Sequence, residues 1–139
     1  MSKTKIVYNY MIEITDIVDG DTVKANIDLG WDIWKKNQTI RLDEIDSPEI
    51  HSENLLEAKA GSAVKTYVEK LFPIGTKTIL KSNSLDKYGR VLGGILLPDG
   101  TDLSDVLLAK KVVKPYSGEK KQLWTEDQLN HIIEILSGK

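Results

Sequence analysis

Strict alternation of apolar and polar side chains over residues 22–29 is the strongest constraint on the fold of this chain. In an extended chain the apolar residues would share one face: Val23, Ala25, Ile27 and Leu29. The polar residues would share the other face: Thr22, Lys24, Asn26 and Asp28. Successive side chains of a strand point to opposite faces, so the segment is predicted to be a half-buried strand. The preceding residues 8–18, YNYMIEITDIV, predict another strand, because they are rich in β-branched and aromatic side chains. Asp19-Gly20 between the two is a turn signal.

Three more strands are predicted further along the chain. Residues 30–37, GWDIWKKN, are expected to form a loop that leads into a strand at 38–42. The last two strands are expected at residues 76–81 and 91–97.

Each of three helices is predicted from an N-cap and a helical stripe of apolar side chains. The predicted starts are Asn54 with Glu57 as a capping box, Thr101 or Asp102, and Thr125 with Gln128. The first helix is expected to stop before Pro73 and Gly75. Three strands, a helix, two strands and two helices is the order expected of an OB-type barrel. The predicted fold class is therefore α+β, a five-stranded OB-type Greek-key barrel with three helices.

Composition limits the chemistry that the chain can support. Its 139 residues fit one domain, residues 1–139, around a single core. There is no cysteine, and His51 and His131 are too few for a zinc site built from several imidazoles. A bound metal is therefore expected to be held by oxygen, which favours calcium, magnesium or manganese.

Charge is balanced overall and uneven along the chain. The net charge is −2, whereas nucleic-acid-binding proteins usually carry a basic surplus. Residues 110–121, KKVVKPYSGEKK, nevertheless hold five lysines against one glutamate. Such a run is either a solvated loop or a local rim that attracts phosphate.

Carboxylates follow two of the predicted strands. Asp21 lies in the first turn, and Asp46 and Glu49 lie in RLDEIDSPEI after the third strand, where Pro48 stiffens the chain. Taken alone, the second group would also suit a turn that enters a helix. If Asp21 and Asp46 meet, a divalent ion would remove their repulsion, with backbone carbonyls and waters completing its ligands. Glu49 could then act as a general base toward a water molecule.

Two arginines are each expected at a strand edge. Arg41 ends the third strand, and Arg90 follows Gly89 in DKYGR just before the fifth. Arginine forms bidentate contacts with phosphate oxygens, so this pair could stabilise charge on a phosphoryl group. The alternative for each is a surface ion pair worth at most ~1 kcal/mol.

VDGDTV, IRLDEIDSPEI and DKYGR, in this order, resemble the staphylococcal nuclease (thermonuclease) family. The resemblance runs from about Ile12 to Trp124. It implies an OB-fold and calcium-dependent hydrolysis of phosphodiester bonds in DNA and RNA by water, leaving 3′-phosphates.

The resemblance also implies a metal site. Asp21 and Asp46 would bind calcium through their carboxylates, and Ser47 through its backbone carbonyl. Asp19 would touch the metal through water. Glu49 would be the general base or would position the attacking water.

The substrate side of the site follows from the same motifs. Arg41 and Arg90 would clamp the phosphate, which makes them catalytic residues together with Glu49. Lys87 and Tyr88 resemble residues at the substrate rim, and Tyr116 resembles an aromatic that stacks near the nucleotide.

A non-catalytic OB module that binds nucleic acid or protein is the alternative function. Some domains of this fold have lost the catalytic residues, and such domains usually lack several of them. The chain retains the whole set, Asp21, Arg41, Asp46, Glu49 and Arg90, which favours the nuclease.

Trp31 and Trp34 have no counterpart in the resemblance. They are interpreted either as a hydrophobic cover for the barrel or as a platform on which single-stranded bases stack. The N-terminal sequence has no signal-peptide pattern and no apolar run approaches ~20 residues. We therefore expect a monomeric cytoplasmic protein, or one of phage or mobile-element origin, with no membrane partner.

Overall fold

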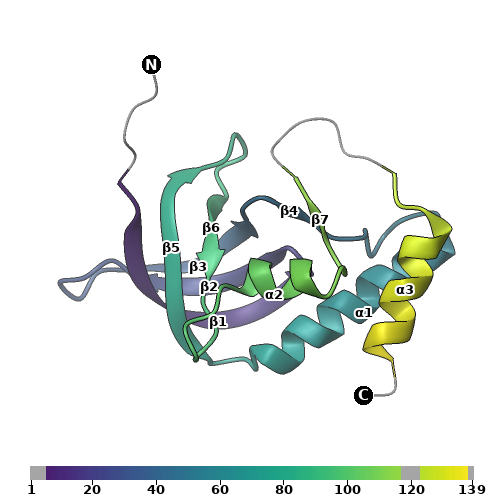
Figure 1. Cartoon of the computed structure of the whole chain (residues 1–139). Helices are drawn as coiled ribbons and strands as arrows, with labels where there is room; N and C mark the ends of the chain where they lie inside the picture. Colours follow the sequence, from purple (N-terminus) through teal and green to yellow (C-terminus); the bar gives the residue numbers. More distant parts are fainter. Residues whose placement is uncertain (1–5, 117–122, 138–139) are drawn as a thin grey trace.

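A computed structural model describes residues 6–116 and 123–137, and its centre is a closed barrel of five strands (Figure 1). Around the barrel the strands are β1 (Tyr8–Asp19), β2 (Thr22–Asp28), β3 (Trp34–Leu42), β6 (Val91–Ile95) and β5 (Lys77–Leu85). Every pairing is antiparallel except that of β3 with β6, which is parallel. This closed mixed barrel confirms the predicted OB-type α+β fold.

Three helices lie outside the barrel, as predicted. They are α1 (Leu55–Leu71), α2 (Leu103–Ala109) and α3 (Glu126–Leu136). In the described part of the chain none of them is long and apolar enough to cross a membrane. Figure 1 shows α3 beside α1, on the side of the molecule away from the β2–β3 hairpin.

A two-stranded sheet outside the barrel was not predicted. It pairs β4 (Ile45–Asp46) with β7 (Lys114–Pro115). Asp46 therefore lies in a short strand, and the prediction that it sits in a loop leaving β3 is wrong. Two residues are too few to carry a strand pattern, because their pairing depends on a partner from far along the chain.

The predicted loop at residues 30–37 is also wrong, because β3 begins at Trp34. The connection between the two strands is only residues 29–33, and Gly30, Trp31 and Asp32 adopt φ values of 85°, 55° and 62° there. The Ile33 N–H donates to the Gly30 carbonyl at 2.9 Å, which closes the hairpin. Residues 34–37 do not alternate in polarity, but pairing with β2 makes them a strand. Leu29 lies in this hairpin and is half-exposed rather than buried.

The first helix is capped differently from the prediction. The Asn54 side chain accepts hydrogen bonds from the N–H groups of Leu56 and Glu57 at 2.9 and 3.3 Å. The Glu57 carboxylate instead accepts from the Glu49 N–H at 3.0 Å and the Ser52 hydroxyl at 3.2 Å. Only the Asn54 half of the predicted capping box forms. The Glu57 side chain, which would have made the other half, instead ties the backbone at Glu49 to α1.

The other predicted N-caps agree with the structure. Thr125 and Gln128 form a full capping box at the start of α3. Asp102, one of the two candidates for α2, accepts a hydrogen bond from the Ser104 N–H. Each such cap stabilises its helix by about 1 kcal/mol.

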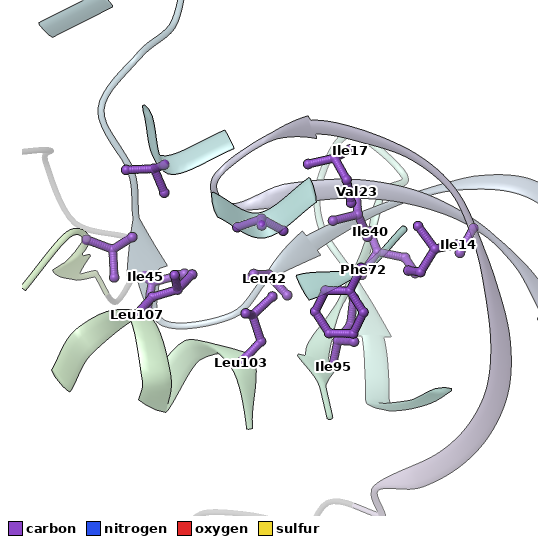
Figure 2. Close-up of a cluster of buried hydrophobic side chains, with 14 of the residues drawn as sticks. Ile14, Ile17, Val23, Ile40, Leu42, Ile45, Phe72, Ile95, Leu103 and Leu107 are labelled. Atoms are coloured by element: carbon purple, nitrogen blue, oxygen red, sulfur yellow. The ribbon is translucent and has the colours of Figure 1, made fainter. Parts of the chain in front are cut away.

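The core runs from the barrel interior to the inner faces of the helices. Figure 2 shows Leu103 and Leu107 of α2 pointing toward Leu42 and Ile45. All four side chains are almost fully buried, and each contributes roughly 1.5–3 kcal/mol by leaving water. This contact fixes the segment that joins β3 to β4, and that segment carries several candidate site residues.

Candidate active site

Arg41 lies at the centre of the candidate site, near the end of β3, and only 9% of its surface is exposed. Its Nη1 donates to the carbonyl oxygens of Leu42 and Ile45, both at 2.8 Å. Its Nη2 lies 3.5 Å from Asp21 Oδ2 and 3.7 Å from Asp46 Oδ1. The backbone thus orients the guanidinium, and the two predicted metal-binding carboxylates both face it.

Hydrogen bonds hold the Asp21 carboxylate from two sides. Asp21 Oδ2 accepts from the Ser47 N–H at 3.0 Å, and Oδ1 accepts from the Thr22 hydroxyl at 2.9 Å. The backbone of the same residue accepts from the Leu42 N–H at 2.8 Å. The β1–β2 turn is therefore joined to both ends of the segment that leads from β3 to β4.

Gly20 is required in this turn for space rather than for a special backbone angle. Its φ does not lie in the left-handed region. A Cβ at Gly20 would lie 2.5 Å from Val64 Cγ1 of α1 and 3.0 Å from Ser47 Cβ. A Cβ at Gly61 of α1 would likewise lie 2.7 Å from the Pro48 carbonyl oxygen. Helix α1 therefore packs closely against both segments that carry the candidate carboxylates.

The Asp19 and Asp21 carboxyl groups are coupled. The Asp21 N–H donates to Asp19 Oδ1 at 3.0 Å. Burial raises the pKa of Asp19 to about 7, and its hydrogen bond and repulsion with Asp21 add to that rise. Burial also opposes ionisation of Asp21, but the hydrogen bond from Asp19 and the Arg41 charge outweigh it and lower the Asp21 pKa. The pair therefore shares one proton below about pH 7, as expected where negative charge is crowded.

The donor set suits a hard cation only in part. Among the described residues no group of three or more Asp, Glu, His or Cys side chains is arranged to hold a metal ion. Asp21 and Asp46 supply carboxylate oxygens, and calcium takes about six to eight oxygen ligands in all. The remaining ligands would have to be backbone carbonyls and water molecules.

Glu49 follows β4 and is exposed. Its charge contributes to the raised pKa of Asp19, so the two carboxyl groups are within electrostatic reach of each other. The Glu49 N–H is held by Glu57 of α1. The backbone that carries Glu49 is thus tied to α1.

Asp86 organises the turn between β5 and β6 that presents Arg90. Asp86 Oδ1 accepts from the N–H groups of Tyr88 and Arg90, each at 2.9 Å, and Oδ2 accepts from Arg90 Nε at 2.7 Å. Gly89 closes the turn with a φ of +82°. Sequence analysis did not single out Asp86, although an Asp at the start of a Gly-containing turn is a known signal.

Five of the predicted residues line one cleft of about 600 Å³. They are Arg41, Lys87, Tyr88, Arg90 and Tyr116. The rest of the wall comes from Leu42, Asp43, Glu44, Ile45, Asp86 and Leu92. The cleft therefore joins the end of β3, the β5–β6 turn and the end of β7.

Cations gather around the exposed ring of Tyr88 in this cleft. Lys87 Nζ lies 5.3 Å from the ring centre and Arg90 Cζ lies 5.6 Å from it. The Tyr116 N–H, also in this cleft, donates to the Glu44 carbonyl at 2.8 Å. The predicted clamp and rim residues are thus close in space.

Two lysines of the segment 110–121 contact other parts of the protein instead of forming a phosphate-attracting rim. Lys110 lies over the Tyr67 ring at 5.5 Å, and Lys114 lies over the Trp124 ring at 4.5 Å. Lys114 Nζ also donates to the Leu123 carbonyl at 2.7 Å. These two lysines pack on aromatic rings, whereas residues 117–122 lie outside the described residues.

A closed OB-type barrel with two arginines in one cleft defines a class of nuclease-like or nucleic-acid-binding domains. The family model described as staphylococcal nuclease homologue matches residues 39–133, more than half of the chain. The chain therefore belongs to the staphylococcal nuclease homologues. The match includes Arg41, Asp46, Glu49 and Arg90 and begins after the β1–β2 turn. A search of curated proteins finds no match.

Proposed function

We propose that this protein is a calcium-dependent nuclease that hydrolyses phosphodiester bonds in DNA and RNA with water and leaves 3′-phosphates. The observation that carries the proposal is the meeting of Arg41 and Arg90 in one cleft, with Asp21 and Asp46 against the Arg41 guanidinium. Arginine forks suit phosphate oxygens, and carboxylates beside them suit a cation that bridges to the same phosphate. All of these residues come from one chain, so the proposal requires only a monomer.

Asp21, Asp46 and the Ser47 carbonyl are the proposed calcium ligands, with Asp19 acting through water. The support is chemical, since every donor is oxygen and the Asp19–Asp21 pair keeps a proton that a cation would displace. Bound calcium would supply positive charge to the phosphoryl oxygens as negative charge develops there.

Glu49 is the proposed general base. It accepts a proton from the attacking water as the new bond to phosphorus forms. The bond from phosphorus to the 5′ oxygen then breaks, and that oxygen takes a proton from solvent, leaving a 3′-phosphate and a 5′-hydroxyl. Arg41 and Arg90 stabilise the charge on the phosphoryl oxygens meanwhile. The exposure of Glu49 and the hydrogen bond that fixes its backbone support this role.

Lys87, Tyr88 and Tyr116 are the proposed contacts to the substrate beside the cleaved bond. Lys87, Tyr88 and Tyr116 all line the cleft. A lysine suits a neighbouring phosphate, and exposed aromatic rings suit base stacking.

A cleavage assay with matched variants tests the proposal. Single-stranded DNA, duplex DNA and RNA are incubated with calcium or with a chelator. Glu49→Gln is expected to lower turnover by about 100-fold or more. Glu53→Gln, an exposed glutamate in the same connection, is the control and is expected to leave turnover unchanged. Full activity in the chelator or in Glu49→Gln would contradict the proposal, and binding without cleavage would favour the non-catalytic module.

A further inference from the structure

A second hollow of about 250 Å³ lies at an end of the barrel that no helix covers. We call it the aromatic groove because Tyr8 and Tyr10 line it. Leu29, Lys35 and Leu85 also contribute to its lining. They come from the start of β1, the β2–β3 hairpin and the end of β5. Figure 1 shows this hairpin projecting away from the side that α1 and α3 occupy.

The groove presents the exposed ring of Tyr8 beside Tyr10, which is partly buried against the core. Tyr8 is 52% exposed. The rings of Tyr8 and Tyr10 are 6.2 Å apart and tilted by 40°. Leu29 and Leu85 are half-exposed on the groove walls. The exposed Lys35 is the cation among the groove-lining residues.

The aromatic groove and the proposed active-site cleft are both lined by residues next to the β5–β6 turn. Leu85 lines the groove and Asp86, the next residue, lines the cleft. On the return strand Val91 lines the groove and Leu92 lines the cleft. A strand of nucleic acid that leaves the cleft across this turn would therefore arrive at the groove.

We infer that the aromatic groove binds an unpaired nucleobase of a single-stranded nucleic acid, beyond the two nucleotides whose phosphodiester lies in the cleft between Arg41 and Arg90. The inference rests on the proposed function and adds to it a second contact surface for the substrate. A base can stack on Tyr8 only when it has left its own stack, which a duplex resists.

Size and charge favour this occupant. Pockets for drug-sized ligands usually hold about 300–1,000 Å³, so this smaller groove suits one flat ring system rather than a larger molecule. Lys35 is placed to contact a backbone phosphate while the rings contact the base.

The test compares variants of the groove with a matched control. Tyr8→Leu removes the exposed ring, and Lys35→Gln removes the cation of the groove. Lys36→Gln is the control, because Lys36 lies over the Trp34 ring, at 4.9 Å, and does not line the groove. Binding of an oligothymidylate of about ten nucleotides is measured in a chelator, so that it does not depend on cleavage. Cleavage of a dinucleotide and of duplex DNA is measured in calcium.

Tyr8→Leu is expected to raise Kd for the oligothymidylate about fivefold or more. Lys35→Gln is expected to lower the slope of log Kd against log salt by about 0.7, the value for one phosphate contact on a single strand. Dinucleotide and duplex cleavage should match wild type in all three variants, since neither substrate places an unpaired base in the groove.

Each departure from these results has one meaning. Cleavage by wild type, with oligothymidylate binding equal in all three variants, overturns the groove and leaves the nuclease. An equal loss on duplex DNA overturns the assignment to single strands. Weakened binding in Tyr8→Leu and Lys35→Gln, with no cleavage by wild type, overturns the nuclease and supports the groove. Failure of wild type to bind the oligothymidylate overturns the groove.

Discussion

Two of the hairpin turns of the barrel, β1–β2 and β2–β3, are built by different rules. In the β1–β2 turn Asp21 is almost fully buried and bonded to Ser47, and Gly20 is in close contact with α1. In the β2–β3 turn Trp31 is 96% exposed, and a Cβ at Gly30 would meet nothing within 4 Å. The first turn is shaped by its tertiary neighbours and the second by its own backbone.

The difference shows where a local preference can be ignored. Hairpin turns whose central residues need positive φ favour Asn-Gly, yet here Trp31 and Asp32 have the positive φ values. This exposed turn can tolerate strained backbone angles, because no residue of the candidate site depends on its geometry. The β1–β2 turn has ordinary backbone angles, and its requirements come from contact with α1 and β4.

Gly20→Ala is expected to have the largest effect on this comparison. The new methyl group would collide with Val64 Cγ1, and such overpacking costs about 1–3 kcal/mol of unfolding free energy. Displacement of Asp21 from Arg41 should also lower the cleavage rate by about tenfold or more. Urea unfolding and the cleavage assay measure the two effects.

Val64→Ala in the Gly20→Ala background provides the control, since it removes the colliding methyl group. Part of the lost activity should return. An unchanged double variant would show that Gly20 acts through its backbone and not through space.

The Asp19 carboxyl is expected to make the stability of the metal-free β1–β2 turn depend on pH. Folding raises the Asp19 pKa from 3.8 to about 7, so the folded protein binds this proton more tightly than the unfolded chain. The resulting stability is complete below pH 3.8 and is lost as the pH rises through about 7. Urea unfolding in a chelator should therefore show the free energy of unfolding falling across neutral pH.

Asp19→Asn should remove this fall, because the amide does not titrate. Asp32→Asn, in the exposed turn, is the matched control and should keep it. The same fall in both variants would assign the pH dependence to another group.

Replacing Trp31-Asp32 by Asn-Gly is expected to have the smallest effect, and a favourable one. Both new residues suit positive φ, so the free energy of unfolding should rise by up to ~1 kcal/mol. Cleavage of the dinucleotide should not change. Destabilisation, measured by thermal melting, would show that Trp31 makes a stabilising contact and that the exposed turn is not governed by its backbone alone.

Much of the fold could be predicted because its signals are local. Alternation at residues 22–29 marked β2, and Thr125 with Gln128 marked the start of α3. The start of β3 at Trp34 could not be predicted, since residues 34–37 are held in a strand by pairing with β2 rather than by their own pattern. The β4–β7 sheet was missed for the same reason.

The candidate site was predicted in its residues but not in its connections. The motifs pointed to Arg41, Asp46 and Arg90. The sequence did not reveal that the Arg41 Nη1 is held by two backbone carbonyls, or that Asp86 fixes Arg90. It also did not reveal that Glu57 leaves its expected capping role to hold the Glu49 backbone. The roles of these residues in catalysis stay predictions.

The sequence by itself determined the strand and helix types, the barrel order and the residue types available for chemistry. These depend on side-chain periodicity, caps and turn residues that act over a few positions. Tertiary structure alone decided that Asp21 and Asp46 share one guanidinium, that Gly20 must lack a side chain, and that the aromatic groove adjoins the cleft. The physical reason is that these are close contacts between distant segments, and only the closed barrel with α1 pressed against it sets their distances.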